Sequence, residues 1–428
     1  MPVRSLFARS RTTAPRRATA VTGAALAAGV MLASGTGAHA LTAAPGTAPS
    51  APSATVTTAA TATTAATAAD VGGRPVMRQL TPRVRAELDR AVRKVLRSTH
   101  TPGVTVGLWA PGKGGYVRAF GTADPATGAP MSSRFAMRVG SVTKTFTVTA
   151  LLRLVDRGQV RLDDPISRYV PGVPNGDHIT LRHLAEMRSG LFNYMLDEGF
   201  IKAYVTDPRR PFGTARLLAY SFRHPVAFAA GTAFQYSNTN TLLLARVVER
   251  VTGQSFDRYV ARHVLRPAHL EHTFMPRGTE FPAPHAHGIT NQTADGSVAD
   301  ATYWNPRMGA PAGAMISTLA DLRSWASTLA DGTLLSPATQ AERLRTKATG
   351  IKGVGYGLGV FDNHGWVGHN GSLPGYQTVM VHLRSAHATL VVHTTSDINV
   401  HGKALSTEFA KAVTSVVTPG NVYAIEAP

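Results

Sequence analysis

The chain has 428 residues, of which 43% are hydrophobic, and it carries a formal net charge of +19. That length allows two or three domains, or one large enzyme of two intimate subdomains, and the apolar content is ample for a buried core. The chain contains no cysteine, which excludes disulfides, a lipid-modified N-terminal cysteine, thiolate zinc sites and a cysteine nucleophile.

The first 40 residues predict a secretory signal peptide. Five arginines precede or flank a modestly apolar run over residues 18–33, and Ala38-His39-Ala40 matches the small-x-small cleavage pattern, so Leu41 is the expected mature start. The run is short and rich in alanine, so we expect no stable membrane span. Arg16-Arg17 leaves twin-arginine export open beside the general route, although the residues after it match that signal poorly. We expect a secreted, extracellular protein and leave association with the cell wall open.

Residues 41–75 predict a linker, because threonine, alanine and proline dominate them and they cannot bury a core. Removal of the leader, which holds five arginines and no acid, would leave a net charge of about +14. A secreted basic chain is drawn to anionic cell-wall polymers and to substrates that carry carboxylates. The basic residues are dispersed, so we expect no nucleic-acid partner.

The folded domain, expected over residues 76–420, opens with a helix and a hairpin. Thr81-Pro82 combines a cap residue with a first-turn proline, which predicts the start of a helix. Residues 103–110 and 116–121 have strand-like composition, and the glycine-rich turn at 111–115 lies between them. A helix-like run over residues 145–155 follows.

Helical patterns then dominate and predict a mostly helical insertion over about residues 162–330. They cover residues 181–187, 215–222, 241–251, 256–264 and 318–329, while residues 281–309 predict a long loop beside the cleft. Strand-like composition returns at 355–361, 366–369, 375–383 and 389–395, before a closing helix at 404–416. Strands at both ends predict an α/β (α+β) fold with one antiparallel sheet flanked by helices. The insertion would form a mostly helical lobe, and the active cleft would lie between lobe and sheet.

The candidate nucleophile is Ser141, three residues before Lys144 and just ahead of a helix. That spacing puts both side chains on one helix face. A serine hydroxyl needs a base, and a neutral lysine can take its proton or relay it. A helix-capping serine beside an unrelated lysine would give the same pattern, so the pair needs further support.

A second element, Tyr236-Ser237-Asn238, precedes a predicted helix. A phenol near a lysine ammonium can have its pKa lowered and serve as a base, and the asparagine amide can hold both the lysine and a substrate carbonyl. Tyr303-Trp304-Asn305 also fits Y-x-N, but it lacks the glycine-led turn before and the helix after.

The third element is His369-Asn370-Gly371-Ser372, which we place at the end of a strand. Gly371 would let a substrate lie along the strand edge. The backbone N–H groups of Ser372 and Ser141 could together form an oxyanion hole. A simple turn between strands is the alternative for this segment taken alone.

In this order, the three elements resemble the serine β-lactamase and penicillin-binding-protein superfamily, whose class A members carry S-x-x-K, S-D-N and K-T-G. The Y-x-N and H-x-G variants look like class C β-lactamases, related esterases and the secreted D-alanyl-D-alanine carboxypeptidases of streptomycetes. The resemblance runs from about residue 80 to 416. It includes Arg138 to Lys144, Leu154 to Gly158, Arg188 to Leu191, Tyr236 to Asn240, Ala312 to Ala314 with Ser317-Thr318, Tyr356 to Gly359, and Gly368 to Gly371.

The resemblance implies a β-lactamase/transpeptidase-like fold and an acyl-enzyme on Ser141. Lys144 and Tyr236 would share the proton work, and Asn238 would position substrate. His369 would contribute charge or a hydrogen bond near the substrate carboxylate, with Gly371 and Ser372 beside it. No cofactor or metal is needed; His285-Ala286-His287 suggests a metal site but has no obvious third ligand.

One residue departs from the carboxypeptidase pattern. An arginine just beyond the Tyr-Gly-Leu-Gly strand holds the terminal carboxylate in those enzymes, and Phe361 stands there in this chain. Arg384 or another basic residue would have to replace it.

The leading interpretation is a carboxypeptidase-like serine hydrolase that acts on cell-wall peptides. The alternatives are a class C-like β-lactamase or esterase, with a β-lactam or ester as substrate, and a penicillin-binding protein with little turnover. No G-x-S-x-G elbow occurs, which argues against another serine hydrolase fold.

Overall fold

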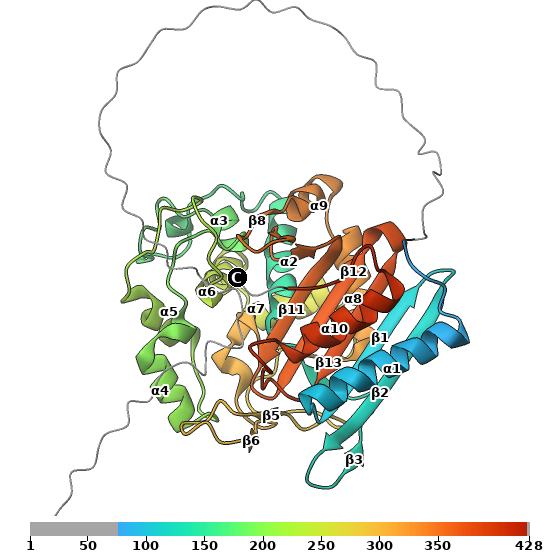
Figure 1. The fold of residues 1–428 in the computed structure, drawn as a ribbon. Helices are drawn as coiled ribbons and strands as arrows, with labels where there is room; N and C mark the ends of the chain where they lie inside the picture. Colours follow the sequence, from blue (N-terminus) through green and yellow to red (C-terminus); the bar gives the residue numbers. More distant parts are fainter. Residues whose placement is uncertain (1–75, 426–428) are drawn as a thin grey trace, which may run out of the picture.

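A nine-stranded antiparallel sheet organises the protein (Figure 1). The computed structural model describes residues 76–425, so the predicted signal peptide and linker lie outside it. The strand order is β3-β2-β1-β13-β12-β11-β10-β9-β8, which joins the two ends of the described chain through the pairing of β1 with β13. The strands are β1 (Gly103–Ala110), β2 (Gly114–Asp124), β3 (Ala129–Pro130), β8 (Lys347–Ala348), β9 (Val354–Tyr356), β10 (Phe361–Asn363), β11 (Trp366–Leu373), β12 (Tyr376–Leu383) and β13 (Ala388–Thr394).

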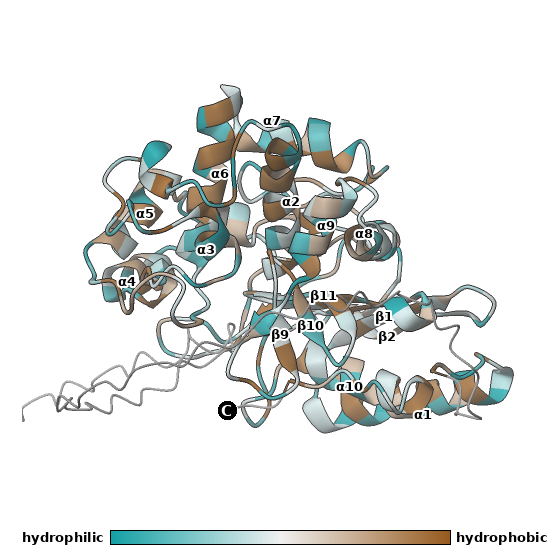
Figure 2. Ribbon diagram, turned by 90° about the horizontal axis from the view of Figure 1, so that it is seen from above, coloured by the Kyte–Doolittle hydropathy of each residue, from teal (hydrophilic) through white to brown (hydrophobic). Residues whose placement is uncertain are grey.

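Two terminal helices cover one face of this sheet. They are α1 (Pro82–Thr99), capped by Thr81, and α10 (Leu405–Val417). Alternate strand residues such as Val106 of β1 and Val392 of β13 pack against them in one core. Figure 2 shows the sheet edge-on, with α1 and α10 on one side and the remaining helices on the other.

The other face of the sheet packs against the helical lobe through residues such as Met380 and Val391. The lobe contains α2 (Thr143–Asp156), α3 (Leu181–Ala185), α4 (Glu198–Thr206), α5 (Thr214–Phe222), α6 (Asn238–Thr252), α7 (Phe256–Val260), α8 (Leu319–Asp331) and α9 (Pro337–Leu344). Short strand pairs join β4 (Met137–Arg138) to β7 (Ile316–Ser317) and β5 (Ile289–Thr290) to β6 (Ala299–Asp300).

Helix α2 is the centre of the lobe and follows a short 3₁₀ turn at Gly140–Val142. Every residue from 143 to 152 is buried, so the helix is enclosed on all sides. Its threonines satisfy their hydroxyls by donating to backbone carbonyls: Thr145 to Val142, Thr147 to Pro311 and Thr149 to Thr145. The polar residues of this helix are therefore compatible with full burial.

Helix α8 connects the sheet to α2. Trp325 of α8 stacks on Phe146 of α2 with ring centroids 4.3 Å apart. Its indole Nε1 donates to Thr145 Oγ1 over 2.8 Å. The contact lies one and two residues beyond Lys144, so α8 helps to hold the candidate catalytic helix in place.

The predicted fold class is confirmed, and most predicted elements lie within a few residues of the observed ones. Two strands were predicted wrongly. Residues 355–361 form two short strands, because a turn with Gly359 at φ +70° separates β9 from β10. Strand β11 continues four residues past His369, so this histidine lies inside the strand and not at its end. No helix within residues 76–425 is long and apolar enough to cross a bilayer.

Replacement of Trp325 by alanine should destabilise the protein by about 3–5 kcal/mol, the usual cost of truncating a buried aromatic side chain. The loss would be measured by urea denaturation. Arg90, exposed on α1, is the matched control, and Arg90→Ala should change stability by less than about 0.5 kcal/mol. An equal, small effect of both variants would contradict the structural role of α8.

Candidate active site

Lys144 reaches Ser141 and two carbonyl oxygens at once. Its Nζ lies 2.8 Å from Ser141 Oγ, 2.7 Å from Asn238 Oδ1 and 2.7 Å from Ala312 O. The two carbonyl oxygens only accept hydrogen bonds, so they take the two hydrogens of a neutral amine. The lone pair of that amine then faces the serine hydroxyl. Lys144 is placed to remove the proton from Ser141.

The environment of Lys144 favours this neutral form. Its side chain is fully buried, and burial lowers its pKa well below the usual value. The three contacts of Nζ are a hydroxyl, an amide oxygen and a backbone carbonyl, none of which is a carboxylate that would hold an ammonium. Ser141 itself is half-buried in the 3₁₀ turn that precedes α2.

Tyr236 lies beside both Ser141 and Lys144. Burial raises the pKa of its phenol, and a hydrogen bond with Ser141 opposes that rise only in part. The centroid of its ring lies 4.9 Å from Lys144 Nζ. The sequence suggested a phenol pKa lowered by a lysine ammonium, whereas the structure raises it, because both groups are buried and the lysine favours its neutral state. Tyr236 is therefore a protonated hydroxyl beside the nucleophile.

Asn238 is fixed by Asn193, which sequence reasoning missed. Asn193 Oδ1 accepts from the backbone N–H of Asn238 over 3.3 Å and from its Nδ2 over 3.2 Å. This leaves Asn238 Oδ1 directed at Lys144. The segment 188–191, noted in the sequence only as part of the resemblance, ends two residues before Asn193. Its Ser189 donates to Asn240 Oδ1 over 2.6 Å and so fastens this loop to the first turn of α6.

Gly371 brings strand β11 against the 3₁₀ turn Gly140–Val142, here called the serine turn. A Cβ at Gly371 would lie 2.1 Å from Val139 O and 2.7 Å from the backbone nitrogen of Ser141. A Cβ at Gly140, whose φ is +53°, would lie 2.4 Å from the backbone nitrogen of Ser372. The N–H groups proposed as the oxyanion hole thus belong to segments in direct contact. The close approach, rather than room for substrate, is what requires glycine at 371.

His369 is buried at 1% exposure and held on both ring nitrogens. Nδ1 is bonded to the carbonyl of Asn370, which can only accept, and Nε2 lies 3.3 Å from the Tyr356 hydroxyl. Burial, followed by the nearby Lys144, lowers the pKa of His369 to about 3. The ring is neutral, so the charge expected of it near a substrate carboxylate is not available.

Phe361 belongs to an aromatic cluster that backs Tyr236. Its ring is nearly parallel to that of Tyr236 at 6.4 Å between centroids, and it lies 4.6 Å from Tyr356 and 4.7 Å from His369. The expected position of a carboxylate-binding arginine is therefore apolar.

Arg384 does not replace that arginine. Arg384 directly follows Leu383, the last residue of β12, which pairs with Trp366 at the far end of β11. Gly371 of β11 pairs instead with Thr378 of β12. Five residues of extended strand separate the two places, or about 16 Å. Arg384 lies too far along the sheet to hold a carboxylate beside Ser141.

The other candidate histidines have local partners. His287 Nδ1 lies 2.7 Å from an oxygen of Asp300, and His285 Nε2 lies 3.3 Å from the Tyr303 hydroxyl. Tyr303, from the second Y-x-N match, is 45% exposed and belongs to this surface cluster. Within residues 76–425 no group of three or more His, Asp or Glu side chains is placed to hold a metal ion.

Comparison with known proteins identifies the family of this chain. A family model described as Beta-lactamase matches residues 88–413. The chain belongs to this family. The superfamily indicated by the three sequence elements, that of serine β-lactamases and penicillin-binding proteins, is thereby confirmed, and with it a β-lactamase-fold serine hydrolase.

Relatives within the family carry different activities in their names. The chain is 31% identical over 314 residues to the esterase EstB of Burkholderia gladioli. This match covers 64% of this chain and 78% of EstB. The chain is 26% identical over 255 residues to Protein flp of Staphylococcus aureus. This match covers 58% of this chain and only about half (49%) of the length of Protein flp. The structure of a D-stereospecific amidohydrolase from Streptomyces sp. superposes with a TM-score of 0.68 at 27% identity, covering 73% of this chain and 94% of that chain.

The acylation rate should depend on pH through Lys144. Protonation removes the lone pair that accepts the serine proton, so the rate falls as pH falls through the lowered pKa of Lys144 and is level above it. The raised pKa of Tyr236 adds no loss of activity in the mildly alkaline range. Labelling by a fluorescent penicillin, followed at several pH values, measures this profile. Activity that appears only above about pH 9 would show that Lys144 keeps a nearly ordinary pKa and would contradict the assignment.

The variant Lys144→Met tests the same role of Lys144 as a base in acylation. Loss of the general base should slow labelling by about 10³-fold without unfolding the protein, since methionine fills a similar buried volume.

Gly371→Ala should slow acylation by about 10²-fold or more, because the added methyl group would separate the two proposed oxyanion-hole N–H groups. The labelling rate and the thermal midpoint would both be measured. Gly420→Ala is the control, since nothing lies within 4 Å of a Cβ at that position. Normal labelling by Gly371→Ala would contradict the close approach of β11 to the serine turn.

Proposed function

We propose that this protein hydrolyses amide or ester bonds of small acyl donors through an acyl-enzyme on Ser141, and that it does not require a free carboxylate on the leaving group. The observation that carries this proposal is the aromatic cluster of Phe361, Tyr356 and neutral His369 behind Tyr236. A carboxylate next to these groups would lose hydration and gain no positive charge from them.

The acylation step uses the groups around Ser141. The lone pair of Lys144 takes the hydroxyl proton while Ser141 Oγ bonds to the substrate carbonyl carbon. The resulting oxyanion is held by the backbone N–H groups of Ser141 and Ser372. When the bond from carbon to nitrogen or oxygen breaks, the departing atom receives a proton from the Tyr236 hydroxyl, which recovers it from Lys144.

Deacylation reverses these transfers with water in place of the leaving group. A water molecule gives its proton to the Lys144–Tyr236 pair and attacks the ester carbonyl. Ser141 Oγ leaves and takes its proton back from Lys144. The cycle consumes one water and leaves both residues as they began.

Support for the substrate class comes from the relatives. The structural neighbour at 27% identity is a D-stereospecific amidohydrolase, and EstB is an esterase. We extend both descriptions to this chain, as hydrolysis of amides or esters whose acyl part has the D configuration.

A D-alanyl-D-alanine carboxypeptidase is the second candidate. It is favoured by the sequence pattern S-x-x-K, Y-x-N, H-x-G, and the predicted export of the chain would place it beside cell-wall peptides. The two candidates differ in one feature of the substrate, the terminal carboxylate. A β-lactamase and a penicillin-binding protein with little turnover share the same acylation step and differ in how fast deacylation follows.

A matched pair of peptides separates the candidates. One ends in D-alanyl-D-alanine with a free carboxylate and the other is identical but carries a C-terminal amide. We expect kcat/KM for the amide to equal or exceed that for the carboxylate, and D-phenylalanine amide to be hydrolysed as well. A preference of about 10²-fold or more for the free carboxylate, the scale of a lost charged contact, would overturn the proposal in favour of the carboxypeptidase.

Nitrocefin and a short-chain nitrophenyl ester complete the panel, with Ser141→Ala as the control that should lose every activity. Fast nitrocefin hydrolysis alone would instead identify a β-lactamase. Stable labelling by penicillin with no turnover of any substrate would identify a penicillin-binding protein.

A further inference from the structure

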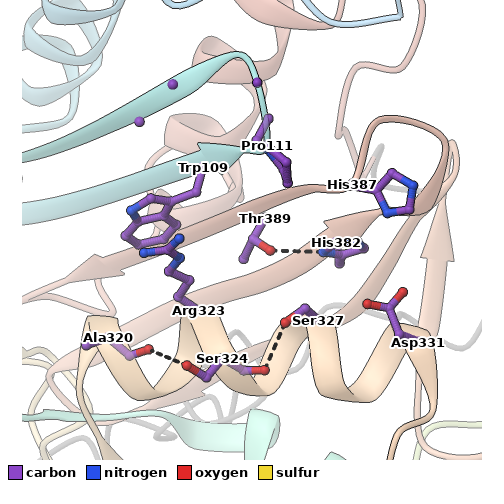
Figure 3. Close-up of a pocket in the computed structure, with 14 residues that line it drawn as sticks. Trp109, Pro111, Ala320, Arg323, Ser324, Ser327, Asp331, His382, His387 and Thr389 are labelled. Carbon is purple, nitrogen blue, oxygen red and sulfur yellow. Dashed lines mark hydrogen bonds between the residues drawn. The ribbon is translucent and has the colours of Figure 1, made fainter.

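A groove with both polar and apolar lining lies on the same face of the sheet as Ser141 but at the opposite end of the strands. It has a volume of about 940 Å³ and is bounded by the β1–β2 turn, the ends of β12 and β13, and helix α8 (Figure 3). Its floor crosses three strands through the paired residues Trp109, Thr389 and His382. His382 lies four residues along β12 from Thr378, the partner of Gly371, so about 13 Å of strand separates the groove from the serine turn.

One end of the groove presents a free cation. Within residues 76–425 the Arg323 guanidinium makes no ion pair, and its one ring contact is with Trp109, whose ring centroid lies 5.0 Å from its Cζ. The indole itself lies across Gly107, where a Cβ would approach it to 2.1 Å. The aromatic platform therefore positions the guanidinium without neutralising it. An arginine held this way suits a phosphate or carboxylate group.

The other end presents an unsatisfied imidazole. His382 is only 3% exposed, its Nδ1 lies 2.9 Å from Thr389 Oγ1, and its buried Nε2 has no hydrogen-bond partner. Burial first, then His387 and Arg384, lower the pKa of His382, while Asp331 raises it. A buried nitrogen without a partner costs free energy, which a ligand hydroxyl at this position would recover.

The charges of the groove exclude a simple polyanion site. Asp331 lines the same end as His382 and has no ion-pair partner in the described part of the chain. A carboxylate repels a second anion but accepts hydrogen bonds from hydroxyl groups. The groove thus combines one anion-binding end with one hydroxyl-binding end, about two strand spacings, or roughly 10 Å, apart.

We propose that this groove binds an acidic sugar or a polyol phosphate, with the anionic group on Arg323 and the hydroxyl groups on His382 and Asp331. The site is distinct from Ser141 and does not depend on the hydrolytic function proposed above. A basic, exported protein would meet such groups on anionic glycopolymers as well as on free metabolites.

The test is calorimetric titration of the chain with glucose 6-phosphate, glucuronate, glucose and inorganic phosphate at low salt. We expect both acidic sugars to bind with a dissociation constant below about 10 mM, and the neutral sugar and the free ion to bind about tenfold more weakly. The tighter of the two acidic sugars identifies phosphate or carboxylate as the preferred anion. No saturable binding of either acidic sugar would overturn the proposal, and equal binding of glucose would overturn the role of Arg323.

Variants locate the binding. Arg323→Gln and His382→Gln should each weaken the acidic sugars by about tenfold, the scale of one charge-assisted or buried hydrogen bond. Arg90→Gln removes the same charge from the opposite face of the sheet and should change nothing. Arg323→Lys, which keeps the charge and the packing of the stem, should retain part of the affinity if Arg323→Gln fails to fold.

Ser141→Ala distinguishes the groove from the catalytic centre. Its affinity for the acidic sugars should equal that of the unmodified chain whatever substrate the enzyme hydrolyses. Loss of binding in Ser141→Ala, or unchanged binding in Arg323→Gln, would place the ligand elsewhere and overturn the proposal.

Discussion

The structure depends on one contact, between the buried amine of Lys144 and the hydroxyl of Ser141. The 2.8 Å separation alone would not activate the serine, because an ammonium would donate to the hydroxyl rather than accept from it. Two carbonyl oxygens and full burial change that outcome by favouring the neutral amine. Desolvation normally destabilises a charged lysine, and here the same physical cost favours the neutral amine that the proposed catalytic base requires.

The partners of this contact come from separate parts of the fold. The 3₁₀ turn before α2 supplies Ser141 and α2 supplies Lys144. The first turn of α6 supplies Asn238, and Ala312 comes from the segment before α8. Strand β11 approaches from the sheet at Gly371. Close packing of α2 against the other helices of the lobe and against the sheet therefore brings the proposed catalytic groups together. The threonines at 145, 147 and 149 of α2 allow that packing because their hydroxyls donate to backbone carbonyls.

The same arrangement limits what the site can recognise. His369 and Tyr356 bond to each other, and Phe361 packs against both, so these three residues satisfy one another behind Tyr236. A histidine buried in this way resists protonation and offers no charge to a substrate. The family likeness thus identifies a serine hydrolase, whereas in our proposal the residues behind Tyr236 decide which leaving groups suit the enzyme.

The sequence by itself determined the family and the fold class, and it proposed the nucleophile and its lysine, because spacing along a helix and three ordered motifs are local patterns. It also placed Tyr236, Asn238, Gly371 and Ser372 among the candidates. Only the tertiary structure decided their electrostatic states, since the pKa values of Lys144, Tyr236 and His369 depend on burial by residues far away in the chain. Asn193 was missed for the same reason, since a hydrogen bond across the lobe leaves no local pattern. The turn inside residues 355–361 does have a local signal, Gly359, but strand-like composition on both sides of it favoured a single strand. The reason Gly371 must be glycine appears only when β11 meets the serine turn, where a single methyl group would meet the backbone.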